Sequence, residues 1–226
     1  MTVLGIETAT AVCAAALVRD GRVEAESLLD AGRVHAERLL GQIVEVLGTG
    51  GVGALEGVAV SIGPGSFTGL RIGVSVAKGL AVARDIPIAA VPTLEALALH
   101  ATATDALPAG ARLVAALDAR RSEVYCQRFD VTAAGAVPAD EPRDVALEVL
   151  LAELGGAPAF VTGDGAAKVL SGPGGPGGLR MVSERARLCS AAAVARIGER
   201  LLAAGSAEDP ALLEPRYIKE FFLTTR

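Results

Sequence analysis

The clearest pattern in this sequence is an apolar run at residues 58–62, followed by a glycine turn and then by apolar positions at helical spacing. The run is rich in β-branched residues and predicts a buried strand. Gly63-Pro64-Gly65 predicts a tight turn, and a helix is expected to begin near Ser66 or Thr68, since either side chain can cap it. Such an arrangement presents backbone N–H groups and a helix N-terminus to anions at the carboxyl edge of a sheet.

Alternating patterns on both sides of that stretch predict the rest of a first lobe. Strands are expected at residues 3–10, 12–18 and 23–29, with a hairpin at Asp20-Gly21, and a helix at about residues 34–47. After the central helix, residues 86–91 indicate a strand and residues 92–100 the start of a helix. Three antiparallel strands followed by parallel crossovers are typical of a ribonuclease-H-like domain, which actin-type ATPases use twice.

The second half repeats this order in outline. Residues 105–110 predict a linker, and residues 113–117 predict a strand that ends in Asp118 and is followed by a turn and a strand at 123–129. Helices are expected at about 143–154 and 190–204, and strands at 159–162 and near 179–182. Glycines and prolines at 171–178 favour a surface loop. We therefore predict two related lobes, residues 1–105 and a smaller, degenerate lobe at 106–226.

The glycine turn fits none of the common nucleotide or catalytic motifs. Thr68 stands where the third glycine of a dinucleotide fingerprint would be, and Lys78 lies too far along the helix for a Walker loop. Ser66 lacks the context of a nucleophilic serine, so helix capping is the simpler role for it. A set of weak candidates for a nucleotide or anion site remains, with turn capping as the alternative for its acidic members: Glu7, Thr8, Gly63, Gly65, Ser66 and Asp118.

Small residues line one side of the central helix. Gly69, Gly73 and Ala77 are four residues apart and share a face, with apolar Leu70 and Val74 beside them. A glycine inside a helix costs about 1 kcal/mol relative to alanine, which suggests that another group approaches closely. The sequence leaves two interpretations open: the stripe packs within its own fold, or it lets a helix of another chain approach.

Composition and charge narrow the class of protein. With 51% hydrophobic residues the chain is not disordered, and it lacks an apolar run of the roughly 18 residues that span a membrane. Glu7 interrupts what would be the core of a signal peptide, so we expect a cytoplasmic location. The net charge of −5 argues against strong unaided binding to nucleic acid. Cys13, Cys126 and Cys189 form no Cys-x-x-Cys pair and are expected to be reduced and structural.

Four motifs, spread over nearly the whole chain, carry a resemblance to a known family. They are GIETAT at 5–10, GPGSFTGLRIG at 63–73, Asp118-Ala119-Arg120 with the following Glu123-Val124-Tyr125, and PRYIK at 215–219. Together they resemble the TsaB (YeaZ) family. The resemblance implies a two-lobed α/β fold of the actin-like (ASKHA, ribonuclease-H-like) type. It also implies a role in forming N6-threonylcarbamoyladenosine at position 37 of tRNAs that read codons beginning with A.

The resemblance implies partners rather than catalysis. In that family the protein assists the catalytic subunit TsaD and works with the ATPase TsaE; tRNA is reached only through the complex, and a homodimer in isolation is an alternative. The catalytic relative has a His-x-x-x-His metal site where this chain has Thr93 and Leu97, with His100 three residues beyond. We therefore expect no metal, no cofactor and no catalytic residue. The rival hypothesis is an actin-fold ATP-dependent kinase or a glycoprotease-like enzyme that uses Glu7, Asp118 or Ser66.

The helix at 34–47 and the central helix are expected to meet the catalytic partner in an intermolecular bundle. The predicted contact residues are His35, Leu39, Ile43, Gly69, Leu70, Gly73, Val74 and Ala77. A bulky residue at Gly73 should then abolish partner binding and leave a folded monomer. The Phe221-Phe222 pair is expected to pack on the body or to touch a partner.

Overall fold

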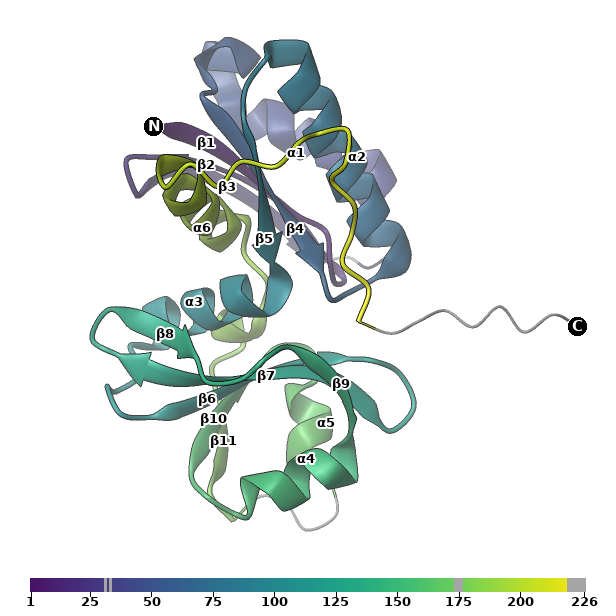
Figure 1. Ribbon diagram of the computed structural model, residues 1–226, viewed down its shortest axis with the longest axis vertical. Helices are drawn as coiled ribbons and strands as arrows, with labels where there is room; N and C mark the ends of the chain where they lie inside the picture. The colour runs from purple at the N-terminus through teal and green to yellow at the C-terminus, as the bar shows by residue number, and fades with distance from the viewer. Residues whose placement is uncertain (31, 33, 173–176, 219–226) are drawn as a thin grey trace, which may run out of the picture.

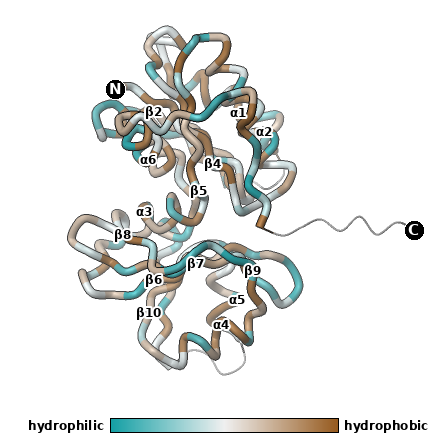
Figure 2. Tube along the Cα trace, in the orientation of Figure 1, coloured by the Kyte–Doolittle hydropathy of each residue, from teal (hydrophilic) through white to brown (hydrophobic). Residues whose placement is uncertain are grey.

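The computed structural model of the chain describes residues 1–30, 32, 34–172 and 177–218, which form two lobes with α3 between them (Figure 1). The expectation for Phe221-Phe222 lies outside the described residues. Figure 2 shows hydrophobic residues along β4 and on α4, and hydrophilic residues at outer turns of the second lobe. No helix of the described ranges has the length and apolar character needed to cross a membrane.

The first lobe contains a five-stranded sheet in the order β3-β2-β1-β4-β5. Its strands are β1 (Thr2–Glu7), β2 (Val12–Arg19), β3 (Arg22–Asp30), β4 (Gly57–Gly63) and β5 (Ile88–Pro92). The first three strands are antiparallel, and β4 and β5 run parallel to β1. This confirms the predicted order, including the hairpin at Asp20-Gly21, where both residues have positive φ.

Helices cover both faces of this sheet because its central strands are apolar on both sides. Leu4 and Ile6 of β1 face the helices α1 (His35–Leu47) and α2 (Phe67–Arg84), whereas Val3 faces α6 (Ala191–Ala203). The 3-10 helix η1 (Gly48–Ala54) joins α1 to β4. Ser66 caps α2, because its Oγ accepts a hydrogen bond from the Gly69 N–H at 3.3 Å, so the first of the two expected caps is confirmed.

The second lobe contains a sheet in the order β11-β10-β6-β7-β8, with β9 paired to β7. Its strands are β6 (Arg112–Asp118), β7 (Glu123–Thr132), β8 (Gly135–Pro138), β9 (Arg143–Ala146), β10 (Ala159–Thr162) and β11 (Leu179–Met181). The helix α3 (Thr93–Asp105) packs on one face, while α4 (Leu147–Leu154) and α5 (Ala166–Leu170) pack on the other. The 3-10 helix η2 (Arg185–Arg187) contacts α3.

Two expectations about the second half differ from the structure. The helix expected at 143–154 begins only at Leu147, because residues 143–146 pair with β7 and Val145 is buried opposite Val124. The lobes also do not divide at residue 105, since α6 packs on β1 and β4 of the first sheet. Residues 206–218, which we call the C-terminal strap, follow α6 back to that lobe, where the Glu208 N–H donates to the Ile88 carbonyl at 2.9 Å.

Candidate functional site

The turn between β1 and β2, residues 7–10, packs directly on the glycine turn and on α2. A Cβ atom on Gly65 would lie 2.3 Å from the carbonyl oxygen of Ala9. On Gly69 it would lie 2.1 Å from the carbonyl oxygen of Thr8, and on Gly73 it would lie 2.3 Å from Thr8 Oγ1. Real Cβ atoms do not approach other atoms this closely. The three positions are therefore glycines because the turn packs directly against the helix at each of them.

Several groups that the sequence suggested as anion-binding donors form hydrogen bonds within the protein. The Ser66 N–H donates to the Ala9 carbonyl at 2.6 Å, and the Thr8 hydroxyl donates to the Gly69 carbonyl at 2.8 Å. The Gly63 N–H donates to Thr93 Oγ1 at 3.1 Å. Because the Thr8 hydroxyl and the N–H groups of Gly63 and Ser66 are engaged inside the protein, the structure does not support these groups as an anion cradle. Gly65 packs against Ala9.

Glu7 is enclosed in the first lobe and does not face a ligand site. Its Oε1 accepts a hydrogen bond from the Ala9 N–H at 2.5 Å, and its Oε2 has no hydrogen-bond partner. Burial penalises the carboxylate and raises the pKa of Glu7 to about 7, although the N–H groups of Ala9 and Thr8 and the Ser61 hydroxyl act in the opposite direction. Solvent does not reach the Glu7 side chain, so the structure gives no support for Glu7 in a nucleotide site, and its hydrogen bond from Ala9 fits the alternative of turn capping.

Asp118 occupies the corresponding strand end in the second lobe but is half exposed. It forms an ion pair with Lys168, and its Oδ1 also accepts a hydrogen bond from the Arg120 N–H at 2.7 Å. Burial works against its ionised form, yet the hydrogen bonds from Lys168 and Arg120 outweigh it and the pKa of Asp118 lies below its ordinary value. In the part of the chain that the structure describes, no hydrogen bond or ion pair brings Asp118 and Glu7 together.

The C-terminal strap joins the last sequence motif to the glycine turn. The Arg216 N–H donates to the Ile62 carbonyl at 2.6 Å, at the end of β4. The Tyr217 hydroxyl accepts a hydrogen bond from Arg71 Nε at 3.0 Å, and the guanidinium of Arg71 lies 3.9 Å from the centre of the Phe67 ring. Arg216 and Tyr217 of the last motif therefore contact the motif at 63–73, a link that the sequence did not reveal.

All eight residues expected to bind the partner are buried within this chain. His35 Nε2 lies 3.1 Å from the Val12 carbonyl, and Gly69 and Gly73 face the Glu7–Thr10 turn. These side chains pack on the first sheet in this structure, so a contact of the two helices with a partner would have to use another side of them. A bulky residue at Gly73 should accordingly destabilise the fold, contrary to the sequence-based expectation.

Another side of the same two helices is left exposed and apolar. Leu40 and Val44 of α1 are 59% and 69% exposed, and Val82 of α2 is 70% exposed. Half-buried Ile72, Val76 and Leu80 also lie on α2, which contacts α1. The sequence held a signal for this surface: the apolar positions of the helix at 34–47 include both Leu39 with Ile43 and Leu40 with Val44, which is wider than one core-facing stripe.

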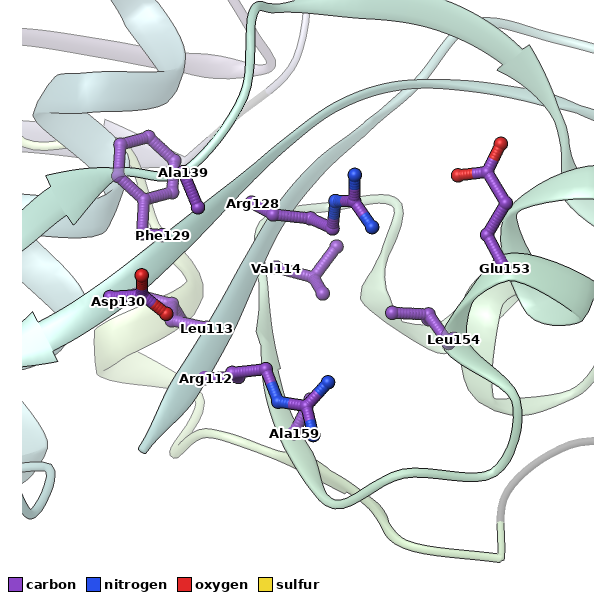
Figure 3. A pocket seen from close by; sticks show the side chains of 10 residues that line it. All are labelled: Arg112, Leu113, Val114, Arg128, Phe129, Asp130, Ala139, Glu153, Leu154 and Ala159. Atoms are coloured by element: carbon purple, nitrogen blue, oxygen red, sulfur yellow. The ribbon is translucent and has the colours of Figure 1, made fainter. Parts of the chain in front are cut away.

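A small hollow in the second lobe has no link to the sequence motifs (Figure 3). Its volume of about 110 Å³ has room for a few water molecules. Two of its charged side chains are already paired, Arg128 with Asp140 at 2.7 Å and Glu153 with Arg143. We assign no function to it.

Thr93 and Leu97, the two positions at which the resemblance led us to look for metal ligands, are used for packing in this chain. Thr93 Oγ1 accepts the Gly63 hydrogen bond, and Leu97 of α3 is fully buried in the core. Across the described ranges, no group of three or more His, Cys, Asp or Glu side chains is placed to bind an ion. Cys13, Cys126 and Cys189 are buried free thiols.

Several known proteins that this chain resembles in sequence are named for threonylcarbamoyl modification of tRNA adenosine. A family model described as TsaD, tRNA N6-adenosine threonylcarbamoyltransferase, matches residues 29–151, more than half of the chain. The tRNA threonylcarbamoyladenosine biosynthesis protein TsaB of Escherichia coli K12 is 39% identical over 131 residues, 57% of this chain and 55% of that protein. TsaB of Bacillus subtilis 168 is 38% identical over 127 residues, 55% of this chain and 53% of that protein. The chain thus spans about half the length of the curated relatives it matches.

A solved structure matches over almost the whole chain. YeaZ from Pseudomonas aeruginosa superimposes with a TM-score of 0.82 at 29% identity, covering 96% of this chain and 99% of that one. The two mixed sheets with their helices are thus the actin-like, ribonuclease-H-like fold that the sequence predicted. The chain belongs to the family that the TsaD model describes and, within it, to the TsaB (YeaZ) group.

Proposed function

We propose that this chain is a noncatalytic subunit in the formation of N6-threonylcarbamoyladenosine at position 37 of tRNA. It binds a catalytic subunit of the TsaD type and works with an ATPase of the TsaE type. The curated relatives are named for threonylcarbamoyladenosine biosynthesis, which supports the pathway. The burial of Glu7 supports the absence of catalysis, because solvent does not reach its side chain, and Ser66 serves as the cap of α2.

The observation that carries the proposal is the exposed apolar side of α1 and α2, which we call the outer helical face and define by Leu40, Val44, Ile72, Val76, Leu80 and Val82. Contiguous apolar side chains at a surface mark sites of protein association. Ser75 and Gly79 are exposed on α2, and a Cβ on Gly79 would meet nothing within 4 Å. Small side chains at these positions would let a helix of the catalytic subunit approach closely.

The test of this face is a charge placed on each of its two helices. We expect Val44→Lys and Val82→Lys each to weaken binding to the catalytic subunit at least tenfold, because burying an unpaired ammonium costs well over about 1.4 kcal/mol. Val149→Lys is the matched control, since Val149 is 49% exposed but lies on α4 in the second lobe. Titration calorimetry with the same organism's catalytic subunit measures the affinities, and circular dichroism confirms folding.

Function is tested by reconstitution. Purified catalytic subunit, ATPase, threonylcarbamoyl-adenylate and tRNA are combined with the wild-type chain, with Val44→Lys, or with no added chain. Modification should need the wild-type chain and fall with Val44→Lys, and the chain alone should modify no tRNA. Equal rates with and without the chain would rule out the proposed role. If both lysine variants bind the catalytic subunit with unchanged affinity, the outer helical face is not the contact surface.

A further inference from the structure

The proposed function does not involve the carboxyl group of Glu7, yet this group is buried inside the first lobe. It is fully buried, and only its Oε1 has a hydrogen-bond partner. Ser61 Oγ of β4 faces the carboxyl group, but neither Ser61 Oγ nor Glu7 Oε2 closes a hydrogen bond of normal geometry. An ionised carboxylate with one bare oxygen is costly in such a place, whereas a neutral acid is tolerated.

Among the residues that the structure describes, no positively charged group shifts the pKa of Glu7. Its charge acts on two thiols, Cys13 in β2 and Cys189 before α6. Burial raises the pKa of Cys13 to about 11 and the pKa of Cys189 well above its ordinary value, so both thiols are neutral near pH 7. α2 contributes Gly69 and Gly73 to the adjoining turn, and neither carries a charge. The protonation of Glu7 is therefore set by burial rather than by an ion pair.

The position of Glu7 is coupled to α2 through two adjoining residues. The Ala9 N–H bonds to Glu7 Oε1, and the Ala9 carbonyl accepts from the Ser66 N–H at the start of α2. Thr8 holds the Gly69 carbonyl through its hydroxyl. A movement that takes the Glu7 carboxylate to water must pull both Thr8 and Ala9 away from the helix.

We propose that the Glu7–Thr10 turn is a proton-dependent latch on α2, closed while Glu7 is neutral and opened when Glu7 ionises. The latch itself is a property of the isolated chain. Its consequence for the partner rests on the proposed function, because α2 carries half of the outer helical face. Alkaline conditions would then loosen the surface that the catalytic subunit binds.

The expected size of the effect follows from linkage. A carboxyl group that titrates at about 7 when buried and at 4.5 in water favours opening more as the pH rises. Between about pH 5.5 and pH 8.5 the opening equilibrium should increase roughly thirtyfold. Glu7→Gln keeps the shape and the neutral state, so this variant should lose the dependence.

The experiment measures deuterium uptake of the isolated chain at pH 5.5 and 8.5, corrected for intrinsic exchange, at the amides of Ser66 and Gly69. The wild type and the exposed control Glu37→Gln should show the increase, whereas Glu7→Gln should not. Nuclear magnetic resonance of the wild type gives a second measurement: the Glu7 carboxyl carbon and the α2 amides should titrate together near pH 7. Uptake that is equal at both pH values, or an equal increase in Glu7→Gln, overturns the latch, as does a carboxyl that titrates at its ordinary value. No partner is present, so these results are independent of the proposed function.

Discussion

Gly73→Ala tests whether the glycines of α2 are there for the Glu7–Thr10 turn. The new Cβ would lie 2.3 Å from Thr8 Oγ1 and 3.5 Å from Thr8 Cβ. The hydroxyl must move by roughly 1 Å to restore an ordinary contact. It cannot do so and also keep its 2.8 Å hydrogen bond to the Gly69 carbonyl, which is buried.

The magnitude combines three contributions. Overpacking a filled site costs about 1–3 kcal/mol. Losing the Thr8 hydrogen bond to a carbonyl that keeps its partner within the helix costs about 0.5–1.5 kcal/mol more, and the better helix propensity of alanine offsets about 1 kcal/mol. We expect a net destabilisation of about 2 kcal/mol, which lowers the melting temperature of a chain of this size by about 4–8 °C.

The matched control is Gly79→Ala in the same helix. A Cβ on Gly79 meets nothing within 4 Å, and the position is exposed. Alanine there should raise the free energy of unfolding by about 0.5–1 kcal/mol, through helix propensity alone. Urea unfolding of both variants, followed by circular dichroism, therefore compares the same substitution with opposite expected signs.

A second substitution identifies the cause. Thr8→Ala removes the hydroxyl that the new Cβ would meet, so Gly73→Ala should cost less than about 1 kcal/mol or even stabilise in the Thr8→Ala background. If Gly73→Ala costs the same in both backgrounds, Thr8 is not the obstacle. A wild-type stability for Gly73→Ala alone would refute the packing argument altogether.

Three further outcomes are expected. The pKa of Glu7 is about 7 in the folded chain and 4.5 when unfolded, so the stabilisation from its neutral carboxyl group is complete below pH 4.5 and is lost as the pH rises to 7. Between pH 5 and 8 the free energy of unfolding of the wild type, measured by urea unfolding, should fall by about 2.5 kcal/mol more than that of Glu7→Gln. Leu213→Ala should cost about 2–5 kcal/mol, and Leu212→Ala almost nothing, since these side chains of the C-terminal strap are 6% and 78% exposed. Glu153→Gln should leave the melting temperature nearly unchanged, because its ion pair with Arg143 is exposed to solvent.

Local patterns predicted the first lobe well because each of its elements is long and carries its own signal. The hairpin at Asp20-Gly21, the cap at Ser66 and the helix that ends at Leu47 all depend on neighbours in sequence. Residues 143–146 form a strand of only four residues next to a helix, which is too short for its period to appear. There the pairing with β7, a contact distant in sequence, decided the structure.

The candidate site was only partly predictable, because sequence shows which residues share a helix side but not what that side meets. Gly69, Gly73 and Ala77 were correctly placed on one face, and both interpretations of that face were physically sound. The deciding contacts come from Thr8, more than sixty residues away in the chain. The return of the strap to the first lobe was hidden for the same reason, since Lys78 donates to the backbone carbonyl of Leu213 at 3.0 Å.

The second lobe, like the first, packs a glycine turn at a strand end against a backbone carbonyl. A Cβ on Gly163 would lie 2.0 Å from the Ala116 carbonyl, and the Gly165 N–H donates to that carbonyl at 3.0 Å. In the first lobe the Ser66 N–H donates to the Ala9 carbonyl, which lies in the turn after β1, whereas Ala116 lies within β6. The two lobes differ in the helix after the turn, because α5 has 5 residues whereas α2 has 18 and carries half of the outer helical face. Both glycine turns therefore pack inside their own lobes. Only the first turn is followed by a long helix, and that lobe is the one that we propose binds the partner.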